Sequence, residues 1–245
     1  MAEERVQKIL ASLGYGSRRA CEEIISAGRV SINGKRIKLG DRADIERDTI
    51  QVDGVKIKKK VIQKVYVALN KPKGVLSDKD PEDPRQTIFD LVNLPGNVFA
   101  VGRLDINSEG LVLITNDGEL ANRLTHPRYE HEKEYRVRLM PEPDDERLAI
   151  WRRGVVLPEG IKTAPAKVFV ESRGAEGAWV RIIMHEGRKR QIREVAKTLG
   201  LRVDRLIRVR IETVTLGSLK SGESRHLSQT EINTLKKAAG LGKKD

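Results

Sequence analysis

The chain has 245 residues, of which 38% are hydrophobic and 33% are charged, so it can bury a packed core beneath a strongly charged surface. Its formal net charge of +12 makes nucleic acid the leading class of partner, because phosphate neutralisation supplies much of the affinity of basic proteins; a basic soluble protein without such a partner is the alternative. The single cysteine, Cys21, excludes an intramolecular disulfide and a thiolate zinc site.

No stretch of the sequence approaches the roughly 18 apolar residues that a membrane-spanning helix needs. The opening segment, MAEERVQKIL, lacks the apolar run of a signal peptide. We therefore expect a cytoplasmic protein that does not enter a membrane, and a monomer is the default expectation for its oligomeric state. The histidines are scattered along the chain, so we expect structural or surface roles for them and no metal site: His126, His131, His185 and His226.

Residues 1–57 predict two short helices followed by a small sheet. Apolar residues at helical spacing mark the first helix, at Val6, Ile9, Leu10 and Leu13. Ser17 can cap a second helix that ends at Gly28 and turns four residues toward the core, namely Ala20, Cys21, Ile24 and Ile25. Two dipeptides typical of tight hairpins follow, Asn33-Gly34 and Asp53-Gly54.

Basic residues gather on this first unit, at the start of the second helix, after its end and around the first hairpin. We expect the following to contact RNA phosphates, a solvated charged face being the alternative: Arg18, Arg19, Arg29, Lys35 and Arg36. The segment RVQKILASLGYGSRRACEEIISAGRVSINGKRI, within residues 5–54, resembles an S4 RNA-binding domain. S4 domains occur in several kinds of RNA protein, so this resemblance implies RNA binding and no particular chemistry.

A lysine-rich linker is expected at residues 58–63, a second domain at 64–237 and a frayed tail at 238–245. In the second domain, segments rich in β-branched residues predict strands at 65–70, 110–116, 135–140, 166–171, 178–184 and 208–214. Residues 119–126 and the segment after Gly187 predict helices. Strands outnumber helices without a repeating βαβ rhythm, which indicates an α+β domain with a mainly antiparallel mixed sheet and flanking helices.

The segment AVGRLDINSEGLVLITNDG, residues 100–118, places Asp105 in a polar turn between two strands. Arg103 is close enough in sequence to keep this carboxylate ionised, since a nearby cation lowers a carboxyl pKa. A carboxylate at such a turn can point into a cleft. On these residues alone a purely structural Asp–Arg turn remains the alternative.

Two further segments carry candidate functional residues. In HEGRKRQIREV, basic residues crowd the start of a helix, an arrangement that a phosphate or a carboxylate would stabilise: Arg188, Lys189, Arg190 and Arg193. In HEKEYRVRL, Tyr135 begins a strand on which apolar and basic residues alternate. Such a tyrosine can stack on an RNA base or belong to the core.

Together, the motifs of residues 64–227 resemble the catalytic domain of ribosomal RNA pseudouridine synthases of the RsuA/RluB type. The resemblance rests on five segments in the expected order: NKPKG (70–74), GRLDINSEGLVLITNDG (102–118), EKEYRV (132–137), EGRKRQIREV (186–195) and RLIRVRI (205–211). The S4-like unit in front matches the same branch. Residues 118–127, GELANRLTHP, look more like the group that modifies 23S rRNA of the large subunit than the small-subunit group.

This resemblance implies that Asp105 is the catalytic carboxylate, that Tyr135 lies against the target uracil, and that Arg193 pairs with the aspartate. It also implies contacts to phosphate or to the pocket from Lys73, Arg103, Arg190, Gln191 and Arg208. The isomerisation of uridine gains and loses no group, so no cofactor is expected. The target base would have to be flipped out of its stack. Asp105 can attack ribose C1′ or remove the C2′ proton, and the sequence leaves both routes open.

Two alternative functions remain open at this point. The same chemistry can act on 16S rRNA or another RNA, or the chain can be a non-catalytic S4-type ribosome assembly factor. A pure RNA binder has no need for Asp105, Tyr135 and Arg193 together. A DNA-binding protein is disfavoured because no helix-turn-helix or zinc-finger pattern is visible.

Overall fold

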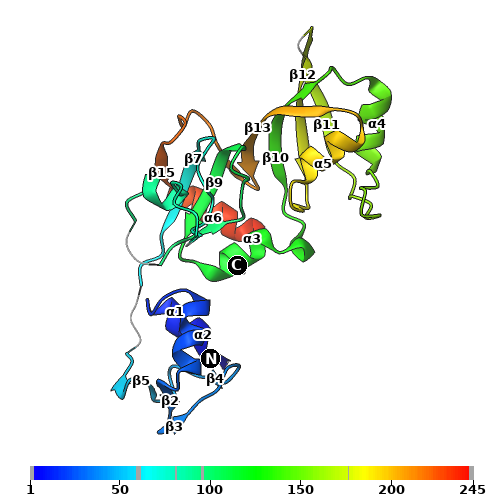
Figure 1. Cartoon of the computed structure of the whole chain (residues 1–245). Helices are drawn as coiled ribbons and strands as arrows, with labels where there is room; N and C mark the ends of the chain where they lie inside the picture. The colour runs from blue at the N-terminus through cyan, green and yellow to red at the C-terminus, as the bar shows by residue number, and fades with distance from the viewer. Residues whose placement is uncertain (1–2, 59–61, 81, 95–96, 176, 243–245) are drawn as a thin grey trace. The chain divides into compact units, whose positions relative to one another are not determined.

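The computed structural model describes residues 3–58, 62–80, 82–94, 97–175 and 177–242 (Figure 1). The chain divides into two compact units, Met1–Lys64 with Pro95–Val98, and Val65–Leu94 with Phe99–Asp245. Of the linker expected at 58–63, residues 59–61 lie outside the described part of the chain.

The first unit contains the two expected helices, α1 (Val6–Ser12) and α2 (Arg18–Ser26). Ser17 caps α2, because its hydroxyl accepts a hydrogen bond of 3.1 Å from the backbone N–H of Ala20. A four-stranded antiparallel sheet follows in the order β3-β2-β5-β6, from β2 (Val30–Ile32), β3 (Lys35–Arg36), β5 (Ile50–Val52) and β6 (Val55–Lys56). A separate pair joins β1 (Glu4–Arg5) to β4 (Arg42–Ala43).

The predicted hairpins are present in this unit, and their turns need the left-handed backbone that Asn and Asp tolerate. Asn33 has a φ of 49° and Asp53 a φ of 52°. One hydrophobic core joins both helices to the sheet, and it includes Val6, Ile9, Leu10, Cys21, Ile25, Val30, Ile50 and Val52.

The second unit is built on one nine-stranded sheet. Its main path runs β11-β12-β10-β13-β9-β7-β15, while β14 pairs with β13 and β8 with β9. The strands are β7 (Tyr66–Lys71), β8 (Phe99–Val101), β9 (Glu109–Thr115), β10 (Lys133–Met140), β11 (Lys167–Gly174), β12 (Gly177–Met184), β13 (Arg202–Ile211), β14 (Val214–Thr215) and β15 (Ser224–His226).

The pairing of β9 with β13 is the one parallel junction among the described strands of this sheet. It joins Glu109 to Ile207 and Gly110 to Arg208. The other pairings are antiparallel, so the predicted mixed and mainly antiparallel sheet is confirmed.

Four α-helices flank this sheet: α3 (Gly118–Thr125), α4 (Asp145–Arg153), α5 (Gln191–Thr198) and α6 (Gln229–Ala238). Two short 3-10 turns add to them, η1 (Ile88–Leu91) and η2 (Pro127–Tyr129). Apolar side chains of α3 and α6 share one core with those of β7 and β9. Helix α5 lies against β13 and α4 against β11 (Figure 1). None of the helices in the described residues is both long enough and apolar enough to span a membrane.

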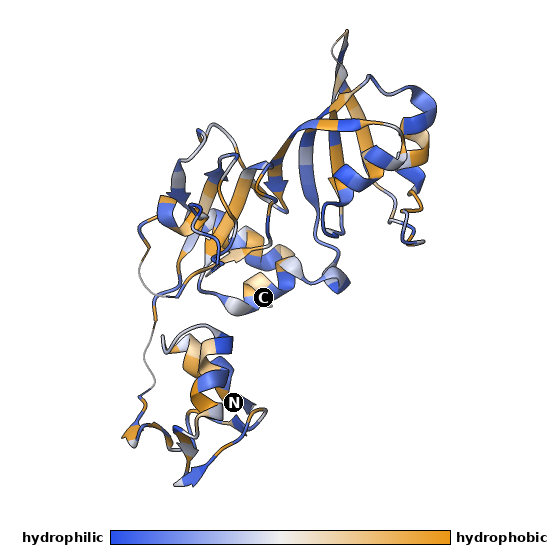
Figure 2. Cartoon of the chain, in the orientation of Figure 1, coloured by the Kyte–Doolittle hydropathy of each residue, from blue (hydrophilic) through white to orange (hydrophobic). Residues whose placement is uncertain are grey.

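Alternation along β10 shows how the sequence sets the buried face of the sheet. Tyr135, Val137 and Leu139 are buried, and Arg136 between them is exposed. Figure 2 shows the same change from hydrophobic to hydrophilic residues along the strands of this sheet.

The segment after α6 differs from the frayed tail that we expected. Ala238 ends α6, Ala239 is only 3% exposed, and Leu241 packs against the core formed with α3. Apolar side chains at these two positions reach the core, so the tail is packed as far as Leu241. Residues 243–245 lie outside the described part of the chain.

Candidate active site

Asp105 lies in the loop that connects β8 to β9, and its side chain is 33% exposed. The backbone around it is fixed. Its carbonyl oxygen accepts a hydrogen bond of 2.9 Å from the N–H of Ser108. The preceding residue, Leu104, is bound at both its N–H and its carbonyl by the hydroxyl of Ser77, at 3.0 and 2.6 Å. The carboxylate is therefore accessible while its main chain is held.

Three cationic side chains hold the loop from within the second unit. They come from three different elements: Lys71 from β7, Arg193 from α5 and Arg208 from β13. They donate hydrogen bonds to the hydroxyl of Ser108 and to main-chain carbonyls. These carbonyls belong to residues 72, 103, 106, 107, 108, 111 and 203. The loop that carries Asp105 is thus fixed by charged donors supplied from distant parts of the sequence.

Lys71 is completely buried, although lysine is rarely found in a protein interior. Its ammonium group donates hydrogen bonds to the carbonyls of Pro72 at 2.8 Å and Ser108 at 2.9 Å, and a longer one of 3.5 Å to Ile106. Burial lowers the pKa of Lys71 to about 8, while the charges of Glu109 and Asp105 act to raise it. The group is therefore a positive charge close to Asp105.

Arg208 is also buried, at 2% exposure. Its Nε donates to the carbonyl of Leu111 at 2.7 Å and its Nη1 to that of Arg103 at 3.4 Å, so one guanidinium binds the main chain on both sides of Asp105. Next to it, Gly110 has a φ of 104°, and a Cβ there would lie 2.3 Å from the carbonyl oxygen of Arg208. Only glycine fits this close approach of β9 to β13.

Arg193, in the first turn of α5, binds the loop that carries Asp105. Its Nη2 donates to the carbonyl of Asn107 at 3.0 Å and to the Ser108 hydroxyl at 3.4 Å, and its Nη1 donates to Val203 at 3.2 Å. The pKa of Arg193 is lowered, mainly by burial and also by Arg190, and the charge of Asp105 opposes this. Arg193 therefore acts on Asp105 through the backbone and at a distance.

The cation nearest to Asp105 is Arg190, with Nη1 3.8 Å from Oδ2 of the carboxylate. Arg190 precedes α5 in the left-handed conformation, with a φ of 55°, which turns the chain from the loop into the helix. Within the described residues, no ion pair joins Asp105 to Arg103 or Arg193. The pairing expected between Asp105 and Arg193 is thus made by Arg190, three residues earlier.

Tyr135 lies on the buried face of β10 and is 7% exposed. Its direct neighbours across the sheet are Ile182 on β12 and Arg208 on β13. Side chains that are directly opposite in an antiparallel pair lie on the same face with Cβ atoms about 5 Å apart. Tyr135 and the loop anchor Arg208 therefore share one face of the sheet.

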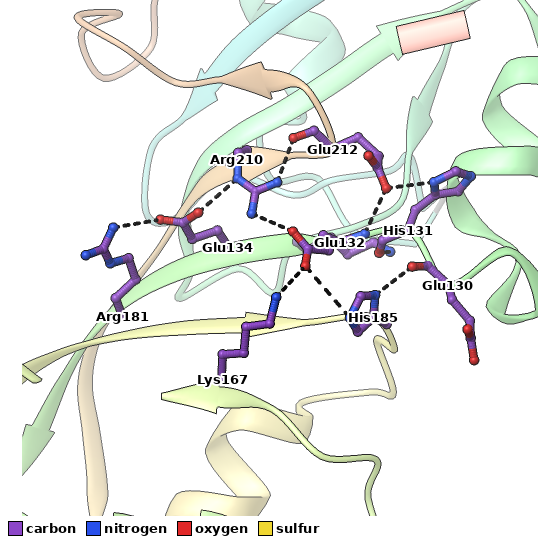
Figure 3. Close-up of polar contacts among 10 residues, drawn as sticks. Glu130, His131, Glu132, Glu134, Lys167, Arg181, His185, Arg210 and Glu212 are labelled. Atoms are coloured by element: carbon purple, nitrogen blue, oxygen red, sulfur yellow. Dashed lines mark hydrogen bonds and ion pairs between the residues drawn. The ribbon is translucent and has the colours of Figure 1, made fainter. Parts of the chain in front are cut away.

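The start of β10 is fixed by a network of charged side chains (Figure 3). Arg210 bridges Glu134 and Glu132, with nitrogen–oxygen distances of 2.9 Å to each. Glu132 also pairs with Lys167 at 3.2 Å. Beside it, Nδ1 of the buried His131 lies 2.8 Å from a carboxylate oxygen of Glu212. These contacts connect the residues before Tyr135 to the end of β13.

The other expected contact residues fall into two groups. Lys73, Arg103, Arg188 and Lys189 are exposed, and the turn after Lys73 touches the catalytic loop, because the N–H of Gly74 donates to the carbonyl of Ile106 at 2.8 Å. Gln191 is buried, and its amide bonds to Glu186, which in turn accepts from the N–H of Ala164. Gln191 thus orders the loop before α5.

In the first unit, Arg18, Arg19, Lys35 and Arg36 are exposed, as phosphate contacts need to be. Arg29 instead makes a two-pronged hydrogen bond with Asp53, at 2.8 and 2.6 Å, which raises the pKa of Arg29 and lowers that of Asp53. Arg29 therefore has a carboxylate partner within its own unit.

The sequence did not single out Lys71 as functional, and it assigned Arg208 to RNA or pocket contacts. A signal existed in NKPKG, where Lys71 precedes a proline and follows an apolar strand. An interior lysine at the end of a buried strand is unusual enough to suggest an internal charged contact.

The arrangement can present one carboxylate, with positively charged side chains around its loop, to an electrophilic carbon or to an acidic proton. Among the described residues, no group of three or more His, Cys, Asp and Glu side chains is placed to hold a metal ion. The groups that stand next to Asp105 are cationic, and they fit a substrate that carries negative charge.

Comparisons with known proteins agree on the family of both units. Residues 65–198 match the family described as RNA pseudouridylate synthase, and residues 4–50 match the S4 domain. A protein of Bacillus subtilis named ribosomal large subunit pseudouridine synthase B is 38% identical over 244 residues, covering 98% of each chain. A protein of Escherichia coli O6:H1 with the same name is 42% identical and covers 97% of this chain and 84% of its own. A crystal structure described as a pseudouridylate synthase aligns with a TM-score of 0.67 at 31% identity, over 94% of this chain and 99% of its own.

Proposed function

Because this chain belongs to the RNA pseudouridylate synthase family, we propose that it converts a uridine of 23S rRNA, in the large ribosomal subunit, to pseudouridine, with Asp105 as the catalytic carboxylate. The observation that carries the proposal is the setting of Asp105. Its carboxylate is 33% exposed, and its loop is anchored by buried cations. The relatives named for the large subunit support the choice of substrate RNA.

The reaction breaks the bond between uracil N1 and ribose C1′ and forms a bond between C1′ and C5. The proton on C5 is lost and N1 gains one, so the product is an isomer. Asp105 can serve as a nucleophile at C1′, or as a base that removes the C2′ proton. Both routes use the carboxylate of Asp105, and Arg190 places a positive charge 3.8 Å from it.

The target nucleotide has to leave its stack before Asp105 can reach its ribose, at a cost of a few kcal/mol. We infer that Tyr135 recovers part of this by stacking on the flipped uracil, at roughly 1–3 kcal/mol for one base. Its position on the same sheet face as Arg208 supports this role.

RNA beyond the target nucleotide would meet exposed cations on both units. On the second unit these are Lys73, Arg103, Arg188 and Lys189, which lie in loops next to Asp105 or before α5. On the S4 unit we propose Arg18, Arg19, Arg29, Lys35 and Arg36, of which Arg29 would have to exchange its partner Asp53 for a phosphate. Such contacts supply affinity that falls steeply with salt.

The test is pseudouridine mapping on unmodified ribosomal RNA incubated with wild-type protein and with Asp105→Asn. The substitution keeps the size of the side chain and removes its charge, so folding and RNA binding should persist while turnover is lost. We expect one new site in 23S rRNA with the wild type only. A new site in 16S rRNA instead would show that the substrate is 16S rRNA and not 23S rRNA. Turnover by folded Asp105→Asn would refute the role of Asp105.

A further inference from the structure

The last turn of α3 and the segment between α3 and β10 (Figure 1) carry a cluster of aromatic and basic side chains that the proposed chemistry does not use. The guanidinium carbons of Arg123 and Arg128 lie 4.7 and 4.5 Å from the centre of the Tyr129 ring. Arg128 also donates a hydrogen bond to the Tyr129 hydroxyl. The ring of His126 meets Tyr129 edge-on, with centroids 6.0 Å apart. We call Arg123, Arg128 and Tyr129 the Tyr129 cluster.

The charge of this cluster is not balanced. Throughout the part of the chain that the structure describes, neither Arg123 nor Arg128 has a carboxylate within ion-pair distance. Arginines elsewhere in the same unit do, as Arg210 has Glu134 and Arg225 has Glu231. Two guanidinium groups on one ring repel each other, so an anion that contacts both would be bound favourably.

The helix that carries Arg123 contacts the loop that carries Asp105. A Cβ at Gly102 would lie 3.8 Å from the methyl carbon of Thr125, the last residue of α3. Gly102 precedes Asp105 by three residues, a reach of at most about 11 Å along the chain. On its other side the cluster leads through His131, whose ring is 6.3 Å from that of Tyr129, into the strand that carries Tyr135. The cluster is therefore linked through Thr125 to the loop that carries Asp105 and through His131 to the strand that carries Tyr135.

We propose that the Tyr129 cluster binds the RNA strand that flanks the target nucleotide, with Arg123 and Arg128 on its phosphates. This inference rests on the proposed function, since it takes RNA to be the substrate. Guanidinium groups bind phosphate oxygens in pairs and stack on bases, which a lysine does less well. Tyr129 holds both side chains in place before RNA arrives, so less conformational freedom is lost on binding.

The chemistry of the cluster favours RNA over a protein partner. A protein surface complementary to it would have to present carboxylates to two adjacent arginines, whereas an RNA strand offers a phosphate at each nucleotide. The closeness of Asp105 also means that RNA is already in place when the active site is filled. Binding here would select RNA by the path of its backbone beyond the flipped base.

The experiment compares Arg123→Gln/Arg128→Gln with the control Arg147→Gln, which removes an exposed arginine from α4. The probe is a 23S rRNA transcript without modifications. Binding is measured across a KCl series with each change placed in the Asp105→Asn background, and KM and kcat are measured without that change. We expect a rise of about tenfold in Kd and KM, with kcat changing less. The slope of log K against log salt should become shallower by about 1.4–1.8.

A Kd and a salt slope for the double variant equal to those of the control would overturn the proposal. A double variant that binds the RNA transcript normally but no longer binds a ribosomal protein would also overturn it. If the double variant does not fold, Arg128→Gln alone decides, because this side chain is exposed. The proposed function fails separately, when wild-type protein forms no pseudouridine in any RNA. The binding series still tests the cluster in that case.

Discussion

The clearest physical test of the candidate site is the replacement of the buried Lys71 by methionine. The change keeps the length of the side chain and removes its charge. Burial shifts the pKa of Lys71 from its ordinary value of 10.5 to about 8, which corresponds to about 3 kcal/mol of unfavourable free energy for the charged form. The substitution removes this unfavourable free energy, but it also removes the hydrogen bonds to Pro72 and Ser108, each worth about 1.5–3 kcal/mol. At pH 7 we therefore expect Lys71→Met to remain folded, with a free energy of unfolding up to about 3 kcal/mol below that of the wild type.

The pH dependence does not cancel in this way. Between pH 8 and 10.5 the unfolded chain holds the proton of Lys71 while the folded chain releases it. The unfolded state then binds more protons, so the free energy of unfolding of the wild type rises with pH, by up to about 1.4 kcal/mol per unit from this group. Below pH 8 both states hold the proton and the contribution is constant. In Lys71→Met the rise is absent.

The assay is urea unfolding of both proteins at pH 7, 8, 9 and 10, with the exposed Lys197→Met as control. Other groups titrate equally in all three proteins, so the difference between wild type and Lys71→Met isolates Lys71. A difference that stays constant across this range would refute the reasoning. Turnover should fall at least tenfold in Lys71→Met, because the carbonyls of residues 106 and 108 lose the group that fixes the loop.

Two other substitutions test the neighbourhood of Asp105. Gly110→Ala should lower the free energy of unfolding by about 3 kcal/mol or more, because its Cβ would collide with the backbone of Arg208; thermal unfolding measures this against Gly160→Ala, which has a similar φ and open space, and equal losses would contradict the close approach. Arg190→Gln should reduce kcat about tenfold or more by removing the cation at 3.8 Å from Asp105, with the thermal midpoint unchanged because the side chain is exposed; a wild-type rate would show that the pair is incidental.

Much of the fold follows from local patterns. The spacing of Val6, Ile9 and Leu10 predicted α1, and Ser17 predicted the start of α2. β-branched runs predicted β7, β9, β10, β11 and β12, since their apolar residues face a core. The strand predicted at 208–214 begins earlier, as β13 (Arg202–Ile211), and β14 and β15 were not predicted. The helices α4 and α6 were not predicted. In α6 the signal was present, since Ser228 and Glu231 form a capping box ahead of the helix.

The candidate site could be predicted only in part. The motif around Asp105 placed the carboxylate in a turn between strands, as observed. Its partners could not be derived from spacing, because Lys71, Arg193 and Arg208 approach the loop from β7, α5 and β13. Such long-range contacts depend on sheet order, which local pattern does not determine. The same reason explains why Arg190, and not Arg193, forms the ion pair with Asp105.

The order of the strands has a consequence for protein synthesis. The loop that carries Asp105 precedes two of the three cations that hold it, Arg193 and Arg208. Arg208 follows Asp105 by about a hundred residues. The strand β15, which completes the sheet beside β7, comes later still. A nascent chain therefore displays Asp105 with Lys71 already synthesised but before Arg193 and Arg208 can bind its loop, and contacts so distant in sequence close late in folding. Synthesis interrupted before β13 would yield a fragment that carries the S4 unit and Asp105 but lacks Arg208, so the S4 unit would emerge from the ribosome before the candidate site is complete.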